Sequence, residues 1–124
     1  PVGPEVITGS TRMKSGTATK LVLNMITTTA MVKRGKVYEN LMVDLKATNI
    51  KLEDRARRIV STITSCSYEE ATDLLVKSEN YVKVALVMHK SHASADESRL
   101  YLDRFDGNVR QAVDELEKTQ TPNK

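Results

Sequence analysis

Residues 67–90, SYEEATDLLVKSENYVKVALVMHK, have a pattern that returns in residues 94–117, SADESRLYLDRFDGNVRQAVDELE. Identical residues occupy several matching positions: Ser67/Ser94, Glu70/Glu97, Leu75/Leu102, Val82/Val109 and Ala85/Ala112. Each copy begins with Ser-x-x-Glu, a capping box that satisfies free amides at a helix start. Each copy is also interrupted by an asparagine, Asn80 or Asn108, before a second amphipathic segment. The repeat predicts two helical hairpins in tandem, which form a small bundle over residues 67–118.

Residues 50–64, upstream of this repeat, also have helical periodicity. Asn49 or Thr48 is the expected N-cap. The apolar residues approximate one stripe: Ile50, Leu52, Ala56, Ile59, Val60 and Ile63. Two pairs on the polar face have the favourable i,i+4 order, Glu53–Arg57 and Asp54–Arg58. Residues 40–46, NLMVDLK, alternate instead, and they predict a short extended segment with Leu41, Val43 and Leu45 on one face.

The N-terminal part combines a polar loop with an unusually apolar helix. Glycine, proline and hydroxyl residues over positions 1–16 are typical of a loop. A helix is expected from Thr17, as a plausible N-cap, to Arg34, and Gly35 is a typical stop signal. Its apolar residues cover most of the circumference, and such helices are normally buried on several sides. The rest of the chain offers little to bury it, so a partner domain or subunit is expected.

Length and composition limit the class of protein. The chain has 124 residues, of which 40% are hydrophobic and 28% charged, as in one globular domain or two very small ones. Cys66 is the single cysteine, which excludes an intramolecular disulfide and fits a reducing, cytoplasmic setting. No apolar run approaches the roughly 18 residues of a membrane span, so no membrane partner is expected. The start, PVGPEVITGS, has neither Met nor a leader pattern, and we expect a piece of a longer protein.

The charge is unevenly distributed between the two halves. Residues 1–66 hold eleven Lys or Arg against five Asp or Glu, whereas residues 67–124 hold eight against eleven. A basic first half favours a phosphorylated ligand or a nucleic acid. The chain has no Trp, one Phe and four Tyr, so platforms for stacking bases are scarce. A small anion is therefore the expected partner, and no nucleic acid.

The densest polar cluster, TGSTRMKSGT, covers residues 8–17 directly before the apolar helix. Arg12 and Lys14 lie among hydroxyls, close to the amides that a helix start leaves free, which is the chemistry of an anion site. The alternative is a capped polar loop with two solvated cations. The cluster is not a Walker A loop, because Gly-Lys-Ser/Thr is missing at the required spacing after Gly9.

Other motifs are better explained by structure than by chemistry. His89 and His92 have metal-like spacing but no convincing third ligand, so no metal is expected. Cys66 is expected as a small buried or interfacial residue. The acidic pairs that follow Ser67 and Ser94 lie in first helical turns, where the helix dipole favours carboxylates.

Residues 3–17, GPEVITGSTRMKSGT, with Lys20 beyond them, resemble the signature of the N-acetylmuramic acid 6-phosphate etherase and glucokinase regulatory protein family. The similarity continues in KLVLN (20–24), GKVY (35–38), NLMVD (40–44), TN (48–49), RA (55–56), SxEEA (67–71) and NYVKVA (80–85). A signature of this length, with further matching residues in the same order after it, favours a sugar-phosphate site over a capped polar loop with two solvated cations.

The resemblance implies a mainly α fold made of two pieces. The first is the end of a sugar isomerase (SIS) α/β domain, and the second is a small ubiquitin-associated-like helical bundle. The expected division is a sugar isomerase remnant over 1–48, a connecting helix over 49–66, the bundle of two hairpin repeats over 67–118 and a tail over 119–124.

The resemblance also implies an activity, that of a lyase. Bacterial etherases of the family cleave the D-lactyl ether of N-acetylmuramic acid 6-phosphate, giving N-acetylglucosamine 6-phosphate and D-lactate in cell-wall sugar recycling. A base takes the proton at C2, an acid helps lactate leave C3, and water then adds. Both groups are carboxylates of the N-terminal half, so no catalytic residue is expected in this chain, which should be inactive alone.

The family implies further expectations about ligands and partners. Ser10, Thr11, Arg12 and Lys14 are the candidate substrate-binding residues. No cofactor is expected, and the parent protein is expected to be a cytoplasmic homodimer. Two alternatives stay open: a sugar-phosphate-binding regulator like glucokinase regulatory protein, and a helical module that docks on another protein.

Overall fold

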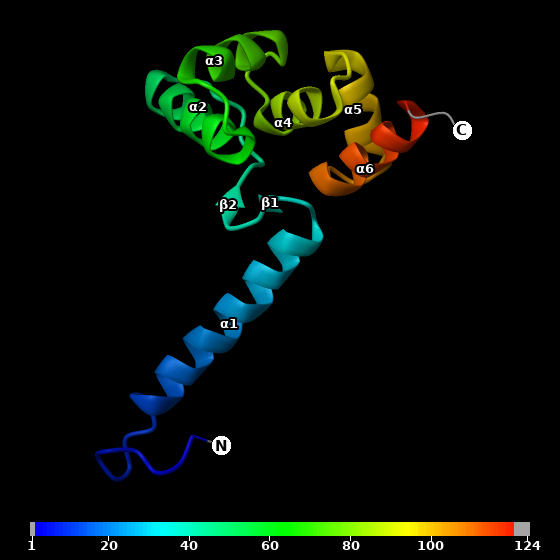
Figure 1. The fold of residues 1–124 in the computed structure, drawn as a ribbon. Helices are drawn as coiled ribbons and strands as arrows, with labels where there is room; N and C mark the ends of the chain where they lie inside the picture. Colours follow the sequence, from blue (N-terminus) through cyan, green and yellow to red (C-terminus); the bar gives the residue numbers. More distant parts are fainter. Residues whose placement is uncertain (1, 121–124) are drawn as a thin grey trace. The chain divides into compact units, whose positions relative to one another are not determined.

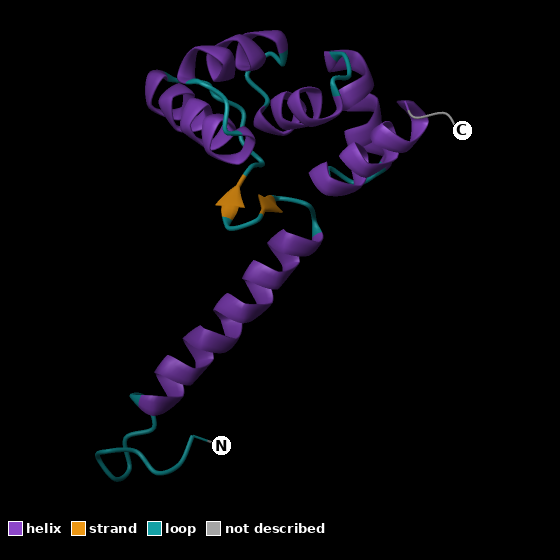
Figure 2. Ribbon diagram, in the orientation of Figure 1, coloured by secondary structure: helices purple, strands orange, loops and turns teal. Residues whose placement is uncertain are grey.

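Helices account for most of the molecule in a computed structural model that describes residues 2–120 (Figures 1 and 2). The mainly α fold expected from the sequence is confirmed. Its elements are α1 (Lys14–Lys33), β1 (Val37–Tyr38), β2 (Leu41–Met42), α2 (Ile50–Thr64), α3 (Tyr68–Lys77), α4 (Val82–Ser91), α5 (Ala95–Arg104) and α6 (Val109–Gln120). The chain forms two compact units, residues 1–33 and 34–124. From residue 121 on, the tail expected over 119–124 lies outside the described residues.

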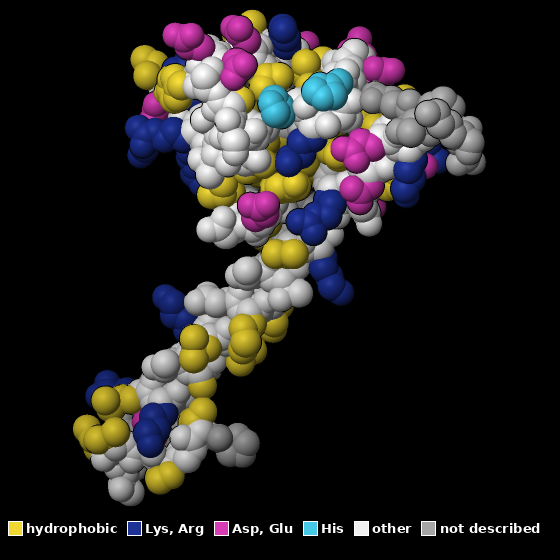
Figure 3. All heavy atoms as spheres, in the orientation of Figure 1, with side chains coloured by type: hydrophobic (Ala, Val, Ile, Leu, Met, Phe, Trp, Pro, Cys, Tyr) yellow, Lys and Arg dark blue, Asp and Glu magenta, His cyan; other side chains and the backbone are white. Residues whose placement is uncertain are grey.

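The first unit consists of a loop followed by α1, whose start was predicted wrongly. The helix begins at Lys14 rather than at Thr17, because the side chain of Glu5 accepts hydrogen bonds from the first amides and caps the helix from a distance. No residue of α1 is buried. Exposed apolar side chains are spread along this helix (yellow in Figure 3), and Met25 and Ile26 are 61% and 60% exposed. The helix is thus as apolar as expected, and none of its residues is buried in the part of the chain that the structure describes.

The second unit opens with a short antiparallel hairpin, in which Tyr38 pairs with Leu41. Only residues 41–42 of the extended segment predicted over 40–46 form a regular strand. Val43 is nonetheless fully buried, and the backbone at Lys46 bridges to Tyr81. The segment therefore packs along the helical bundle as an irregular extended chain, and it contributes Val43 to the core of the bundle.

The helix predicted over residues 50–64 is confirmed as α2. Asn49 is its N-cap and accepts a hydrogen bond from the amide of Leu52 at 3.0 Å. Both predicted ion pairs, Glu53–Arg57 and Asp54–Arg58, are present. The apolar stripe is buried at Ala56, Ile59 and Val60. Ile50 is the exception at 85% exposed, because it is the first helical residue and lies beyond the packed part of the stripe.

The two predicted helical hairpins are confirmed as α3–α4 and α5–α6, each with its capping box. The Ser67 hydroxyl accepts from the Glu70 amide at 3.1 Å, and the Ser67 amide donates to the Glu70 carboxylate at 2.9 Å. Ser94 and Glu97 make the same two bonds at 3.3 and 3.0 Å. The first helix of each hairpin is therefore fixed by the same short-range hydrogen bonds.

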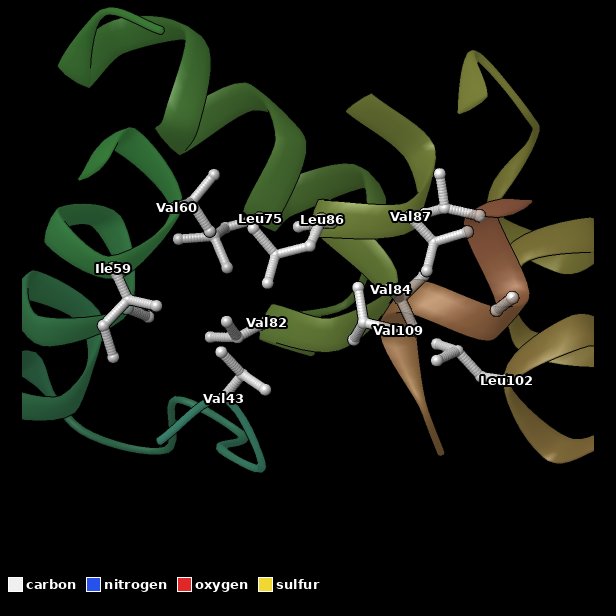
Figure 4. Close-up of a cluster of buried hydrophobic side chains, with 14 of the residues drawn as sticks. Val43, Ile59, Val60, Leu75, Val82, Val84, Leu86, Val87, Leu102 and Val109 are labelled. Carbon is white, nitrogen blue, oxygen red and sulfur yellow. The ribbon is translucent and has the colours of Figure 1, made fainter. Parts of the chain in front are cut away.

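The core lies around α4, which packs against α2, α3, α5 and α6. Figure 4 shows the side chains of Val43, Val60 and Leu75 gathered around Val82 and Leu86. Val43, Val60, Val82 and Leu86 are fully buried. Burying each of these side chains contributes on the order of 1.5–3 kcal/mol to folding. Among the described residues, no helix has both the length and the hydropathy to cross a bilayer.

Candidate functional site

The loop before α1 is a compact turn rather than an open strand. The amide of Ser10 donates to the carbonyl of Ile7 at 3.1 Å, and Gly9 between them has φ +81°. The amide of Arg12 in turn donates to the carbonyl of Ser10 at 3.1 Å. A positive φ at Gly9 is available to glycine at little steric cost. The hydroxyl and basic residues of the predicted site therefore lie on one short, tightly folded segment.

Glu5 holds the base of this loop. Its carboxylate accepts the amide hydrogens of Lys14 at 3.0 Å and of Ser15 at 3.2 Å. The hydrogen bond from the Lys14 amide is the main influence that lowers the pKa of Glu5 below its usual value; desolvation opposes it, and hydrogen bonds from the amides of Ser15 and Met13 lower the pKa further. The amides that the sequence pattern leaves free for a ligand are thus already bound to a carboxylate of the same chain, which corrects that expectation.

The four predicted site residues lie within this loop and the first turn of α1. The Arg12 Nε donates to the Ser10 hydroxyl at 3.0 Å, so these two residues are in direct contact. The Lys14 ammonium turns back and donates to the carbonyl of Pro4 at 2.8 Å. The backbone of Thr11 accepts a hydrogen bond from the Ser15 hydroxyl at 3.0 Å. Arg12 and Ser10 therefore form one polar group, while Lys14 contributes to closing the loop.

Arg12 and Lys14 face different hollows of the first unit. Arg12 borders a cavity of about 410 Å³ together with Thr17, Lys20 and Asn24 of α1. Lys14 borders another, of about 450 Å³, which is lined largely by apolar side chains such as Val6. The hollow beside Arg12 has two cations, a hydroxyl and an amide, groups that can bind a phosphorylated sugar, and Met13, Gly16 and Leu21 line the rest of it.

Lys20, Thr17 and Asn24 are site candidates that the sequence analysis did not select. Their positions follow the spacing i, i+3 and i+7, which aligns side chains along one face of a helix. This spacing already falls within the helix predicted from Thr17 to Arg34, and it is the signal that could have found them.

The second unit has a larger groove, of about 670 Å³, beside α4 and α5. Two of its three basic side chains are paired with carboxylates: the Lys83 ammonium lies 2.9 Å from Asp44, and the Arg99 guanidinium lies 3.2 Å from Glu79. The third, Lys46, lies over the ring of Tyr81, 4.5 Å from its centre. Because the carboxylates of Asp44, Glu79 and Asp103 equal these cations in number, the groove has little preference for an anion. The loop before α1 remains the better candidate for a phosphate ligand.

The histidine, cysteine and acidic motifs noted in the sequence lie at helix ends and in the hydrogen-bonded parts of the second unit. His92 is the left-handed C-cap of α4 with φ +55°. Cys66 is half-buried, and its carbonyl accepts a hydrogen bond from Ser61 at 2.7 Å. Glu70 and Glu97 are confirmed as members of capping boxes. Within residues 2–120, no group of three or more His, Cys, Asp or Glu side chains is arranged to hold a metal ion.

Known proteins match this chain along most of its length. Residues 39–94 match the family described as the C-terminal lid domain of glucokinase regulatory protein. The N-acetylmuramic acid 6-phosphate etherase of Lactobacillus acidophilus is 51% identical over 90% of this chain and 38% of its own length. The etherase of Synechocystis sp. is 56% identical over 90% of this chain and 37% of its own length. That of Clostridium beijerinckii is 55% identical over 94% of this chain and 38% of its own length. The chain thus spans well under half the length of these curated relatives.

Proposed function

From the confirmed resemblance of this chain to the N-acetylmuramic acid 6-phosphate etherases, we propose that it is the C-terminal part of such an enzyme, a bacterial lyase. The whole protein would cleave the D-lactyl ether of N-acetylmuramic acid 6-phosphate to N-acetylglucosamine 6-phosphate and D-lactate. The observation that carries this proposal is identity of 50% or more over about nine tenths of the chain. The catalytic carboxylates would lie in the other part of the enzyme, and this chain alone would be inactive.

The fold assigned with this function has two pieces. Residues 1–48 would be the end of the sugar isomerase domain, with residues 34–48 packed in the same compact unit as the bundle. Residues 49–66 would be a connecting helix, residues 67–118 a ubiquitin-associated-like bundle and residues 119–124 a tail, whose first two residues continue α6. The uncovered apolar surface of α1 supports the first piece, since a helix of this composition is normally packed inside a domain. The capped hairpins over 68–120 support the second.

The substrate-binding part of the proposal concerns the loop before α1. Ser10, Thr11, Arg12 and Lys14 would bind the sugar phosphate, and Lys20 joins them because it borders the same cavity as Arg12. An arginine guanidinium donates several hydrogen bonds in a plane, a geometry well matched to phosphate oxygens. The contact of Arg12 with Ser10 supports this role, because it holds the guanidinium in one orientation.

The parent enzyme would be a cytoplasmic homodimer in cell-wall sugar recycling, acting without a cofactor. A single half-buried cysteine supports a reducing compartment. The elimination and hydration need only an acid, a base and water, so the chemistry places no demand on a cofactor.

A regulatory sugar-phosphate binder is the second candidate, favoured by the match to the lid domain of glucokinase regulatory protein over residues 39–94. It would require a second sugar isomerase domain in the full reading frame. A helical module that docks on another protein is a third candidate. A pull-down experiment that captures only further copies of this chain would be evidence against it.

The decisive experiment uses the full-length protein and N-acetylmuramic acid 6-phosphate. Release of D-lactate by the full-length protein, with none from the 124-residue chain, is the expected result. Release by the chain alone would contradict the assignment of the catalytic carboxylates to the other part. Tight binding of a sugar phosphate without any lactate release would favour the regulator.

A further inference from the structure

Glu5 joins two parts of the chain that lie nine and ten residues apart in sequence. Its two carboxylate oxygens accept separate amide hydrogens, one from Lys14 and one from Ser15. Its neighbour Pro4 accepts a third hydrogen bond, from the Lys14 ammonium at 2.8 Å. The two ends of the loop are therefore held together by three hydrogen bonds from adjacent residues on each side.

The loop closed in this way contains the polar group proposed for phosphate binding. Between the two ends, Arg12 contacts the Ser10 hydroxyl, and the Ser15 hydroxyl donates to the carbonyl of Thr11. The Arg12–Ser10 bond sets a local turn, whereas the Ser15 hydroxyl and the Gly16 amide, which donates to the carbonyl of Arg12 at 3.2 Å, join the end of the loop to the first turn of α1. The beginning of the loop, by contrast, is attached to the helix start by Glu5 and by the Lys14–Pro4 bond.

The contact of the Glu5 carboxylate with the amides of Lys14 and Ser15 restricts where a phosphate can bind. Two of the amides at the start of α1 already donate to a carboxylate, and a second anion at this point would be repelled by Glu5. The guanidinium of Arg12 has further N–H groups besides the one given to Ser10. Side chains of the loop and of α1, rather than the helix amides, are thus the groups available to a phosphate.

We propose that Glu5 is a positioning residue: its carboxylate clasps the loop against the first turn of α1 and holds Arg12 at the cavity shared with Lys20. This inference rests on the proposed function, and it adds a residue that touches neither the substrate nor the reacting atoms. A flexible loop would have to become ordered on each binding event, which lowers affinity. Because the Glu5 hydrogen bonds already order the loop in the free protein, binding of the sugar phosphate does not have to supply this ordering free energy.

If Glu5 instead competed with the phosphate for the helix amides, its removal would change the binding affinity in the opposite direction. A carboxylate that merely blocks the helix start would compete with phosphate, and its removal would free two amides and strengthen binding. Removal of a clasp would instead weaken binding. The direction of the change therefore separates the two roles.

The test compares Glu5→Gln and Glu5→Ala with the wild type in the full-length enzyme, using N-acetylmuramic acid 6-phosphate. Glu69→Gln is the control, because Glu69 is an exposed carboxylate in the first turn of α3 that is outside the capping box. We expect KM to rise by about tenfold or more in Glu5→Ala, with a smaller fall in kcat, because misplaced binding groups are costly. Glu5→Gln should be intermediate, since its amide oxygen still accepts a hydrogen bond.

Deuterium exchange of the peptide over residues 10–20 gives the local readout. Faster exchange in Glu5→Ala, with normal exchange elsewhere, is expected for an opened loop in a folded enzyme. An unchanged or lower KM in both variants would overturn the clasp while leaving the proposed function intact. A wild-type enzyme that neither binds nor cleaves the phosphosugar would overturn the proposed function, and this inference with it.

Discussion

A β-carbon built on Gly35 would lie 2.8 Å from the carbonyl oxygen of Gly107, so the two glycines meet backbone to backbone. Gly35 precedes β1, and Gly107 lies in the turn between α5 and α6. Both have positive φ, +63° and +76°, a conformation that other residues rarely adopt. The contact closes the second unit, because it joins its first residues to its last helical hairpin.

Replacing Gly35 should therefore destabilise the second unit. In Gly35→Ala the new methyl group meets backbone atoms that cannot move aside, and the backbone keeps an unfavourable φ. We expect a loss of about 1–3 kcal/mol, measured as a lower urea midpoint. Gly16→Ala is the control, because its β-carbon would meet open space within α1. Equal midpoints for Gly35→Ala and the wild type would show that the contact is absent.

Asp44→Asn should also reduce the stability of the second unit. Burial acts to raise the pKa of Asp44, but hydrogen bonds from Lys83 and Lys36 outweigh it and keep this pKa below its usual value. The variant leaves the Lys83 side chain, only 14% exposed, without its anion. We expect a loss of about 1–3 kcal/mol in urea unfolding. Arg58→Ala removes an exposed ion pair and should change stability by less than about 0.5 kcal/mol.

Acid sensitivity should depend on the two capping boxes. Hydrogen bonds from the amides of Ser67 and Ser94 lower the pKa values of Glu70 and Glu97 below 4.5 in the folded state. Their contribution is therefore complete above the unfolded value and is lost as the pH falls through the folded values. The double variant Glu70→Gln/Glu97→Gln keeps the acceptors without the titration. Its stability should fall less than that of the wild type between about pH 5 and pH 3.

Glu69→Gln provides the comparison for this pH experiment, because Glu69 lies in the same helical turn but outside the capping box. It should leave the slope of stability against pH unchanged. Parallel slopes for the double variant and the wild type would mean that other carboxyl groups cause the acid sensitivity.

Arg12→Ala should weaken substrate binding in the full-length enzyme. A charge-assisted hydrogen bond to phosphate contributes roughly 1.5–3 kcal/mol, which corresponds to a rise in KM of about ten- to more than a hundredfold. Arg34→Ala removes an exposed cation beyond the end of α1 and should leave KM unchanged. An unchanged KM in Arg12→Ala would remove Arg12 from the site.

The 124-residue chain should self-associate through α1. Leu23 and Ile26 are 55% and 60% exposed on a helix without any buried residue, and association would remove this apolar surface from water. Sedimentation should detect dimers or larger species, and Leu23→Lys/Ile26→Lys should restore the monomer. Ile50→Lys, at an isolated exposed position of α2, should have no effect. A stable wild-type monomer would be evidence against this use of α1.

The part of the fold that follows from neighbouring residues was readable in the sequence. Asn49 caps α2, and Ser67 and Ser94 close capping boxes with residues three positions away, so each hydrogen bond is set by local spacing alone. The repeat of this spacing was enough to predict both helical hairpins. The position of Arg12 in a polar loop before a helix was equally clear, because it depends on consecutive residues.

Tertiary structure alone decided where distant residues meet. The start of α1 at Lys14 depends on Glu5, whose hydrogen bonds cross nine and ten residues, and no local pattern encodes them. The contact of Gly35 with Gly107 likewise needs the whole second unit to be assembled. Spacing along the chain determines helices and caps because their hydrogen bonds are short-range. Long-range contacts such as that of Gly35 with Gly107 depend on how the finished helices pack, whereas the hollow that Arg12 shares with Lys20 is formed by neighbouring residues of the loop and of α1.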